Sequence, residues 1–393
     1  MCYNGDMKDF DYLGAGEVYL DTACQSLRPR SVVEAINKYY TEHNSCGERV
    51  KYKWGVETDE KVEATRAAVL KFLKLPARKY TVSFTLNTTY GINLILSQLR
   101  SELFKKVMTS EIEHNSPFLA TMAFAERTGL PREVMEREQN GSINLNNYDF
   151  SGAVVVVNCV SNFNDQKLTN INELIKVVHK AGGIVVIDGA QAIHAMDILR
   201  GAEADAICLS AHKLYAPSLG IIAWRDDLME KMAVGFVGGG MVDDVNKESY
   251  VLSAEGKEHR YTRFESGLQA WGEIVGLGEA LKWLDKSVSK KDWQNLEKNY
   301  TELYEFLAGS EKVRILNHEA DATMSFYVDG FDSHLLGNAL SRENIMARTG
   351  YFCAHYYLDH TLHCPPLMRF SLGLHNRPED IAKIKKVMEK ILY

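Results

Sequence analysis

A lysine stands directly after one of the apolar runs of this sequence, where a chemical role is the simplest explanation for it. The stretch "ICLSAHKLYAPSLGIIAW" carries Lys213 between two strand-like segments. Burying an ammonium group is costly, so lysine is an unfavourable residue with which to end a buried strand. A lysine amine in such a place can instead form a Schiff base with a carbonyl compound. We therefore treat Lys213 as a candidate catalytic residue and not as a surface lysine.

Other apolar runs also end in polar side chains. Each of five runs is followed by polar residues. Thr88 and Thr89 follow "TVSF", His114 follows "VMTSEI" and Asn162 follows "AVVVVNCV". Asp188 and Gln191 follow "IVVI", and Ser210, His212 and Lys213 follow "AICL". In an α/β sheet, ligands bind at the carboxyl ends of the strands, so these side chains are expected to meet. Their convergence predicts a site for a single polar ligand.

The residue types indicate what that ligand is. Polar groups at a helix N-terminus form an anion site, and the side chains predicted to hold a phosphate are Thr88, Thr89, Ser210 and His212. Asp188, as a buried carboxylate, needs a cationic partner such as a protonated pyridine nitrogen. Lys213 supplies an amine for an aldehyde, and His114 could stack on a flat ring. Phosphate, pyridinium and aldehyde together describe pyridoxal phosphate, whose ring acts as an electron sink.

The elements that must position these residues follow an α/β pattern. Helical and strand-like runs alternate from about residue 60 to 225, and the strand runs are almost continuously apolar, as in a parallel sheet buried on both faces. After Arg263 the pattern changes to long helices followed by short strands, which predicts a smaller α+β domain. We expect an N-terminal arm over residues 1–15, a large cofactor-binding domain over 16–275 and a small C-terminal domain over 276–393, which N-terminal residues could complete.

Eight short motifs occur in an order that is typical of one enzyme family. They are "FTLNTTYGIN", "EIEHN", "VSNFND", "VIDGAQAIHAMDI", "SAHKLYAP", "RFESG", "RTGYFCA" and "RFSLGLHN". With them the sequence resembles the class V, fold-type I pyridoxal-phosphate enzymes, closest to their cysteine desulfurase and selenocysteine lyase branch. The resemblance runs from "YLDTACQSLRP" to "MRFSLGLHNRPEDI". It implies a large domain with a mostly parallel seven-stranded sheet between helices.

The resemblance also assigns roles to residues. It makes Lys213 the lysine that forms a Schiff base with the cofactor, and Thr88, Thr89, Ser210 and His212 its phosphate ligands. Asp188 would pair with the pyridine nitrogen, and Gln191 would hydrogen-bond the ring hydroxyl. His114 would stack on the ring, and Asn162 would lie near the ring hydroxyl and the substrate. Arg369 would bind the substrate carboxylate, and Cys353 would be the nucleophile.

The activity implied by the resemblance is that of a homodimeric cysteine desulfurase, which takes sulfur from L-cysteine, holds it as a persulfide on Cys353 and passes it to a protein acceptor. The alternatives are a class V aminotransferase, an epimerase or a lyase acting on another sulfur or selenium amino acid, and a non-catalytic scaffold. An aminotransferase would not depend on Cys353. The intact Lys213, Asp188 and Arg369 argue against a scaffold.

Three positions depart from the family pattern. Leu268 stands where the family usually has a threonine that reaches the phosphate in the partner subunit. Asn115 replaces a second histidine after His114, and the segment after Cys353 is rich in tyrosine and histidine. These departures lie near the substrate and leave its identity open.

Simpler interpretations exist for several of these residues. Thr88, Thr89 and His114 could cap helices, Asp188 could form a turn, Arg369 could belong to a structural ion pair, and Cys353 could be unreactive. The cluster Cys353, His355, His360, His363 and Cys364 matches no common zinc spacing, so we predict no metal site. The run Gly238–Gly240 is not a phosphate loop, because it follows no strand-to-helix pattern; the family places it at the dimer interface.

Composition excludes some classes of protein. The net charge is −7 and no block of lysine and arginine stands out, which argues against nucleic-acid binding. No apolar run is long enough to span a bilayer, and the first residues lack the pattern of a signal peptide. The 7 cysteines are odd in number and scattered, so they do not form a disulfide framework, and Cys159 and Cys208 are expected in the core. We therefore expect a cytoplasmic protein.

Overall fold

A central sheet of seven strands organises the larger part of the molecule, as a computed structural model of the chain describes it over residues 7–47, 50–253 and 257–392. In sheet order the strands are β2 (Tyr80–Thr85), β8 (Gly220–Arg225), β7 (Ala206–Ser210), β6 (Ile184–Asp188), β5 (Ala153–Asn158), β3 (Lys106–Ser110) and β4 (Arg132–Met135). The neighbours from β7 to β4 are parallel, and β8 is antiparallel to β7 and β2. The predicted α/β fold with a mostly parallel seven-stranded sheet is confirmed.

The two faces of this sheet are covered by different helices. Alternate residues of a strand point to opposite faces, so Val155 and Val157 share a core with α2 (Lys53–Leu73), α5 (Ile171–Lys180) and α8 (Trp271–Lys286). Val154 and Val156 pack on the other side with α3 (Thr88–Gln98) and α4 (Asn115–Thr128). Every side chain of β5 is buried, which explains why this run is continuously apolar.

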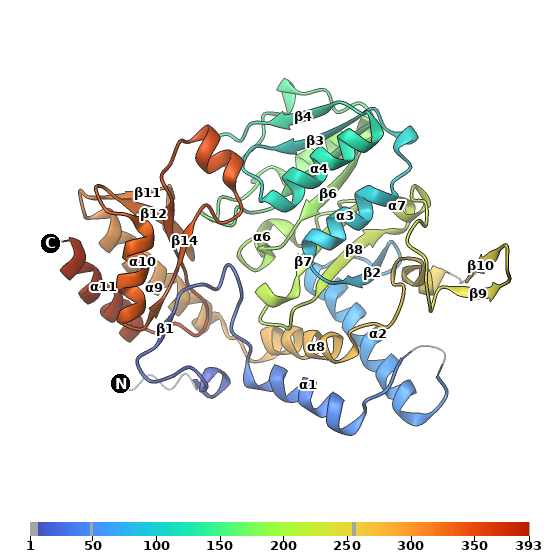
Figure 1. The fold of residues 1–393 in the computed structure, drawn as a ribbon, viewed down its shortest axis with the longest axis horizontal. Coiled ribbons are helices and arrows are strands. Elements are labelled where there is room, and N and C mark those ends of the chain that lie inside the picture. The colour runs from blue at the N-terminus through green and yellow to red at the C-terminus, as the bar shows by residue number, and fades with distance from the viewer. Residues whose placement is uncertain (1–6, 48–49, 254–256, 393) are drawn as a thin grey trace.

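A second, smaller sheet forms the C-terminal part. Its antiparallel strands, in order, are β11 (Val313–Ile315), β12 (Thr323–Val328), β15 (Leu367–Ser371) and β14 (Arg348–Gly350). Helices α9 (Lys290–Ala308), α10 (Ser333–Arg342) and α11 (Pro378–Leu392) share its apolar core and gather at one end of the molecule (Figure 1). The N-terminal strand β1 (Val18–Tyr19) pairs with β13 (Ile345–Met346), so the start of the chain joins this part.

The remaining elements are short or lie at the periphery. They are α1 (Arg30–Glu42), α6 (Met196–Leu199), α7 (Asp226–Glu230), β9 (Val242–Val245) and β10 (Tyr250–Leu252). The β9–β10 hairpin projects from the body of the molecule at the end opposite α9–α11 (Figure 1). Its Val245, Tyr250 and Val251 are exposed. Among the described helices, none combines the length and the apolarity needed to cross a membrane.

A buried ion pair anchors the "RFESG" segment to the large sheet. The carboxylate of Glu265 accepts two hydrogen bonds of 2.7 Å from the guanidinium of Arg66, and a third of 2.6 Å from the backbone N–H of Phe84 in β2. Both charged side chains are almost fully buried, and such bidentate pairs fix orientation as well as position. This contact sets where the neighbouring Leu268 lies.

Candidate active site

The polar strand ends converge on one cavity of about 290 Å³. Every predicted site residue lines it: Thr88, Thr89, His114, Asn162, Asp188, Gln191, Ser210, His212, Lys213, Cys353 and Arg369. The first nine come from the ends of strands of the large sheet or from the segments that follow them, whereas Cys353 and Arg369 come from the C-terminal part. The cavity is therefore lined by residues of both parts of the molecule. The roles assigned to these residues remain predictions.

Lys213 ends a short 3₁₀ turn, Ala211–Lys213, that follows β7 directly. The Ser26 hydroxyl donates a hydrogen bond of 3.0 Å to the backbone carbonyl of Lys213 and fixes this turn. Burial lowers the pKa of Lys213 to about 8; Asp188 opposes this shift and Arg369 adds to it. Roughly a tenth of the Lys213 amine is therefore neutral and nucleophilic at pH 7, far more than in a lysine with the ordinary pKa of 10.5.

Asp188 and Gln191 lie beside this lysine at the end of β6. Asp188 is in register with Asn158 of β5 and Cys208 of β7, and its Oδ1 accepts a hydrogen bond of 2.9 Å from the Ala190 N–H. Burial raises the pKa of Asp188, so a cation bound next to it would stabilise its charged form. Gln191 Nε2 donates to the Ala23 carbonyl at 2.7 Å, and Gln191 Oε1 is buried without a partner.

Hydroxyl groups surround the N-terminus of α3. Asn87 caps this helix by accepting a hydrogen bond of 2.8 Å from the Tyr90 N–H. The simpler interpretation of Thr88 and Thr89 as caps is therefore wrong. Thr88 Oγ1 lies 2.6 Å from Ser210 Oγ, and Thr89 Oγ1 lies 2.6 Å from the Ser116 hydroxyl. Hydroxyls from three segments thus meet at a helix N-terminus, an arrangement suited to an anion.

The two histidines of the site carry no charge near neutral pH. Burial, with the charges of Lys213 and Arg369, lowers the pKa of His114 to about 3. Burial and Lys213 lower the pKa of His212 to about 4. The simpler interpretation of His114 as a helix cap agrees with the structure, because its Nδ1 accepts a hydrogen bond of 3.0 Å from the Ser116 N–H at the start of α4. Its neutral ring also lines the cavity and is free to stack.

Arg369 is held by a network that sequence reasoning missed in part. Its guanidinium donates to Asp21 Oδ1 and to the Asn162 carbonyl, both at 2.9 Å, and lies 4.8 Å from the ring centroid of Phe352. Arg369 is buried and its Nε has no partner. The structural ion pair considered from the sequence is therefore present, and the guanidinium keeps further N–H groups, among them Nε–H, for a ligand.

Arg348 and Cys24 also line the cavity and did not appear among the predicted residues. Arg348 is the first residue of the "RTGYFCA" motif, and Cys24 follows Asp21 in "YLDTAC". Both motifs belong to the family pattern, but neither residue follows a strand of the large sheet, so the strand-end rule does not select them. Position within a family motif was the only signal that could have found them.

The segment around Cys353 is held by contacts with the large domain. Phe352 and Cys353 both have positive φ values, 49° and 58°, a conformation that costs a residue with a side chain about 1–3 kcal/mol unless its surroundings hold it. Asn162 Nδ2 donates to the Phe352 carbonyl and the Asn115 N–H to the Cys353 carbonyl, each at 2.6 Å. Tyr356, in the helical turn that follows, stacks on Phe118 with centroids 4.6 Å apart.

Two of the departures from the family pattern now have a structural account. Asn115 binds the Cys353 segment through its backbone, and its amide lies 3.1 Å from His355 Nδ1. Leu268 is 78% exposed and contributes nothing to the cavity of its own chain. Within the described residues, no cluster of histidine, cysteine and carboxylate side chains is arranged to hold a metal.

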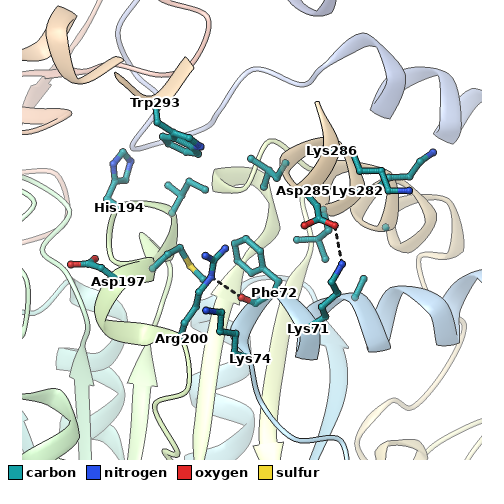
Figure 2. A pocket seen from close by; sticks show the side chains of 16 residues that line it. Lys71, Phe72, Lys74, His194, Asp197, Arg200, Lys282, Asp285, Lys286 and Trp293 are labelled. Carbon is teal, nitrogen blue, oxygen red and sulfur yellow. Dashed lines mark hydrogen bonds and ion pairs between the residues drawn. The ribbon is translucent and has the colours of Figure 1, made fainter. Parts of the chain in front are cut away.

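A larger cavity, of about 830 Å³, lies elsewhere, between α2, α6, α8 and α9 (Figure 2). The residues that line this cavity contact one another in two places. Lys71 pairs with Asp285 at 2.8 Å, and Arg200 donates a hydrogen bond to the Phe72 carbonyl at 3.1 Å. None of the predicted site residues lines this cavity. A choice of active site by cavity volume alone would therefore have selected a cavity that none of the predicted site residues lines.

The family is decided by comparison with known proteins. The model of the aminotransferase class-V family matches residues 18–384. This chain belongs to the aminotransferase class-V family. The predicted resemblance to the class V enzymes is thus confirmed, and the cavity described above is the candidate active site of a member of that family.

Several class V relatives are named as cysteine desulfurases. A probable cysteine desulfurase of Vibrio cholerae is 28% identical over 387 residues, which cover 95% of this chain and 93% of the relative. One of Pseudomonas aeruginosa is 28% identical and covers 99% of this chain and 98% of the relative. The solved apo structure of cysteine desulfurase from Thermococcus onnurineus is 26% identical, with a TM-score of 0.86 over 96% of this chain and 95% of that one. Cysteine desulfurase CsdA from Escherichia coli, at 22% identity and a TM-score of 0.87, shares the fold.

Proposed function

We propose that this class V chain is a pyridoxal-phosphate-dependent cysteine desulfurase. It converts L-cysteine to alanine and keeps the sulfur as a persulfide on Cys353. The observation that carries the proposal is that a buried lysine with a lowered pKa, a buried aspartate, an arginine and an accessible cysteine share one cavity. Relatives of similar length that bear this name support it.

The residues present fit pyridoxal phosphate. The buried acceptors Gln191 Oε1 and Asn162 Oδ1 have no donor within the described chain, and the hydroxyl of a bound ring would donate to one of them. An unsatisfied buried acceptor costs about 1–3 kcal/mol, so these atoms favour a ligand that donates to them. Asp188 would stabilise a protonated ring nitrogen, and the hydroxyls of Thr88, Thr89 and Ser210 would hold the phosphate.

The chain's own groups divide the work on the substrate. Arg369 binds the substrate carboxylate through guanidinium N–H groups that its contacts with Asp21 and Asn162 do not use. Pyridoxal phosphate, when bound, withdraws electrons from Cα of the amino acid. The neutral amine of Lys213 removes the Cα proton as a general base, and its burial shields it from water. The neutral His114 ring, which lines the cavity, would hold the cofactor ring without adding a positive charge.

Cys353 receives the sulfur. Its thiolate attacks the substrate Sγ, a new S–S bond forms, and the Cβ–Sγ bond breaks. The electron pair of that bond stays with carbon, which takes up protons and leaves as alanine. The balance is L-cysteine plus a thiol giving alanine plus a persulfide, with no outside oxidant. The two asparagine contacts hold the Cys353 backbone at the cavity, so the sulfur travels a short distance.

The test of this function is the product pair. The cofactor-loaded protein is incubated with L-cysteine and a dithiol reductant, and sulfide and alanine are quantified. A parallel reaction with an added keto acid measures amino transfer. Equal amounts of sulfide and alanine support the desulfurase. Transfer of the amino group to the keto acid without sulfide would identify an aminotransferase and overturn the proposal.

Attachment of the cofactor should depend on pH through Lys213. Only the neutral amine is nucleophilic, and the pKa of Lys213 is lowered from 10.5 to about 8. The rate should therefore rise with pH and level off above about 8. Cofactor-free protein is mixed with pyridoxal phosphate at a series of pH values, reduced with borohydride, and the label on Lys213 is measured by mass spectrometry. A midpoint near 10.5, the ordinary value for a lysine, would contradict the account.

We further propose that the enzyme is a homodimer. Leu268 and Phe236 are exposed apolar side chains, and the projecting β9–β10 hairpin adds more. In the class V pattern, the position of Leu268 and the run Gly238–Gly240 lie at the subunit interface. Leu268 then lies near the partner's cofactor phosphate, where leucine donates no hydrogen bond.

Leu268→Thr should tighten cofactor binding. A hydrogen bond to a charged group contributes about 1.5–3 kcal/mol, so the Kd for pyridoxal phosphate should fall at least about 10-fold. Fluorescence titration of cofactor-free protein measures it, with the exposed Leu335→Thr in α10 as the matched control. An unchanged Kd for Leu268→Thr would remove Leu268 from the phosphate site.

The remaining expectations stay proposals of the same kind. We propose a boundary between the large and small domains near residue 275, inside α8, and a protein as sulfur acceptor. The cysteines that the structure describes are all unpaired, including the one proposed as nucleophile. Free thiols persist in reducing compartments, which supports a cytoplasmic location.

A further inference from the structure

A second thiol faces the candidate active site. Cys24 lines the same cavity of about 290 Å³ as Lys213 and Cys353. Its backbone is anchored by hydrogen bonds. The Cys24 N–H donates to the Asp21 carbonyl at 3.0 Å. The neighbouring Ala23 donates its N–H to Ser371 Oγ and accepts a hydrogen bond at its carbonyl from Gln191 Nε2. Cys24 is therefore fixed at the wall of the cavity by residues that belong to the site.

Arg348 links the two thiols. Its Nη2 lies 2.8 Å from Cys24 Sγ, and its Nε donates to both carboxylate oxygens of Asp21 at 3.1 and 3.0 Å. Burial lowers the pKa of Arg348, but the hydrogen bond and charge of Asp21, followed by the charges of Cys24 and Cys353, raise it overall. The Arg348 guanidinium thus lies against Cys24 Sγ, and its charge also interacts with Cys353.

The cavity that the two thiols share is built to hold a polar ligand. Arg369 Nε, Gln191 Oε1 and Asn162 Oδ1 are buried, have no partner in the described chain and belong to residues that line the cavity. These atoms point to a ligand at this place, independently of the cysteines. A sulfur atom released from that ligand would be within the same small space as both thiols.

The other cysteines differ from this pair. Cys159 and Cys208 are fully buried, and burial raises the pKa of each thiol. Cys46 is exposed, and neither Cys46 nor Cys364 lines the cavity. Among the cysteines that the structure describes, Cys24 and Cys353 are the two that the cavity brings together.

We propose that Cys24 is a second sulfur carrier, which takes the outer sulfur atom of the Cys353 persulfide. This inference rests on the proposed desulfurase function. The Cys24 thiolate attacks the outer sulfur, a new S–S bond forms on Cys24, and the S–S bond on Cys353 breaks. The electron pair stays on the Cys353 sulfur, so one persulfide and one thiol exist before and after the step, and no oxidant or reductant is needed.

The consequence is that one chain stores two sulfur atoms. After the transfer Cys353 is again a thiolate and can act on a second L-cysteine before any acceptor arrives. Without reductant, the wild-type enzyme should give a burst of about two alanines per chain, and Cys24→Ser about one. Cys46→Ser, outside the cavity, is the matched control and should keep the wild-type burst.

Peptide mapping of the alkylated persulfides locates the sulfur. The proposal expects persulfide on both Cys24 and Cys353 in the wild-type enzyme, on Cys353 alone in Cys24→Ser, and on neither in Cys353→Ala. Persulfide on Cys353 alone in the wild type, with the same burst in Cys24→Ser, would overturn the relay and leave the desulfurase standing. Loading of Cys24 in Cys353→Ala would also overturn it, because Cys24 would then take sulfur directly. Absence of alanine and of any persulfide would overturn both proposals.

A readout without turnover supports the same test. In cofactor-free protein, Arg348→Gln should slow alkylation of Cys24 by iodoacetamide several-fold and leave that of Cys46 unchanged. Equal alkylation rates of Cys24 in the two proteins would remove Arg348 from the relay.

Discussion

Lys213→Ala is expected to lower the rate of alanine formation from L-cysteine by at least about 10³-fold, because it removes both the amine that binds the cofactor and the general base. Lys213 is buried, and no other lysine that the structure describes lines the cavity to take its place. The loss should appear in kcat, measured at saturating L-cysteine with excess pyridoxal phosphate, since the carboxylate clamp at Arg369 is unchanged.

One control variant and one further readout sharpen this measurement. Lys71→Ala removes a lysine that is exposed and pairs with Asp285 in the other cavity, and it should leave kcat unchanged. Lys213→Ala should also abolish exchange of the substrate Cα hydrogen with deuterium from the solvent. Normal exchange in Lys213→Ala would mean that another group removes the Cα proton.

Cys353→Ala is expected to abolish sulfur transfer while sparing the steps before it. Sulfide and alanine formation should fall by at least about 10²-fold, because the substrate sulfur loses its acceptor. Exchange of the Cα hydrogen with solvent deuterium should continue, since Lys213 and the cofactor-holding residues are intact. The two variants therefore fail at different steps, and nuclear magnetic resonance of the recovered L-cysteine separates them.

The control for this variant lies in the same segment. Cys364 packs with Phe352 and Leu358 in a small apolar cluster and does not line the cavity. Cys364→Ala should retain sulfide formation. If Cys353→Ala retained it as well, the sulfur would leave without a covalent carrier, and Cys353 would be a residue of the fold.

The large sheet could be predicted from sequence because its signal is local. Each central strand is a short, continuously apolar run, and the structure shows why: Val154 and Val156 face one core while Val155 and Val157 face the other. Polar residues directly after such runs mark the carboxyl edge of the sheet. That rule found Asp188 and Lys213 without any knowledge of tertiary contacts.

The network behind Arg369 could not be found in this way. Asp21 and Arg348 are 327 residues apart in the chain and meet only because β14 and the segment after β1 lie together in the fold. Cys24 is placed by the same contacts. The alternative interpretation of Thr88 and Thr89 as helix caps also could not be decided from spacing, because the neighbouring Asn87 is an equally good cap and is the one that caps α3. Contacts of this kind depend on geometry that residue spacing does not encode.

The most direct test of the account is a single reaction without reductant. The cofactor-loaded enzyme is mixed with a small excess of L-cysteine, quenched, and analysed for free alanine and for sulfur bound to cysteine side chains by mass spectrometry. The account predicts as many bound sulfur atoms as alanine molecules, with Cys353 the first site to be loaded. Alanine without bound sulfur, or conversion of L-cysteine to a keto acid, would contradict it.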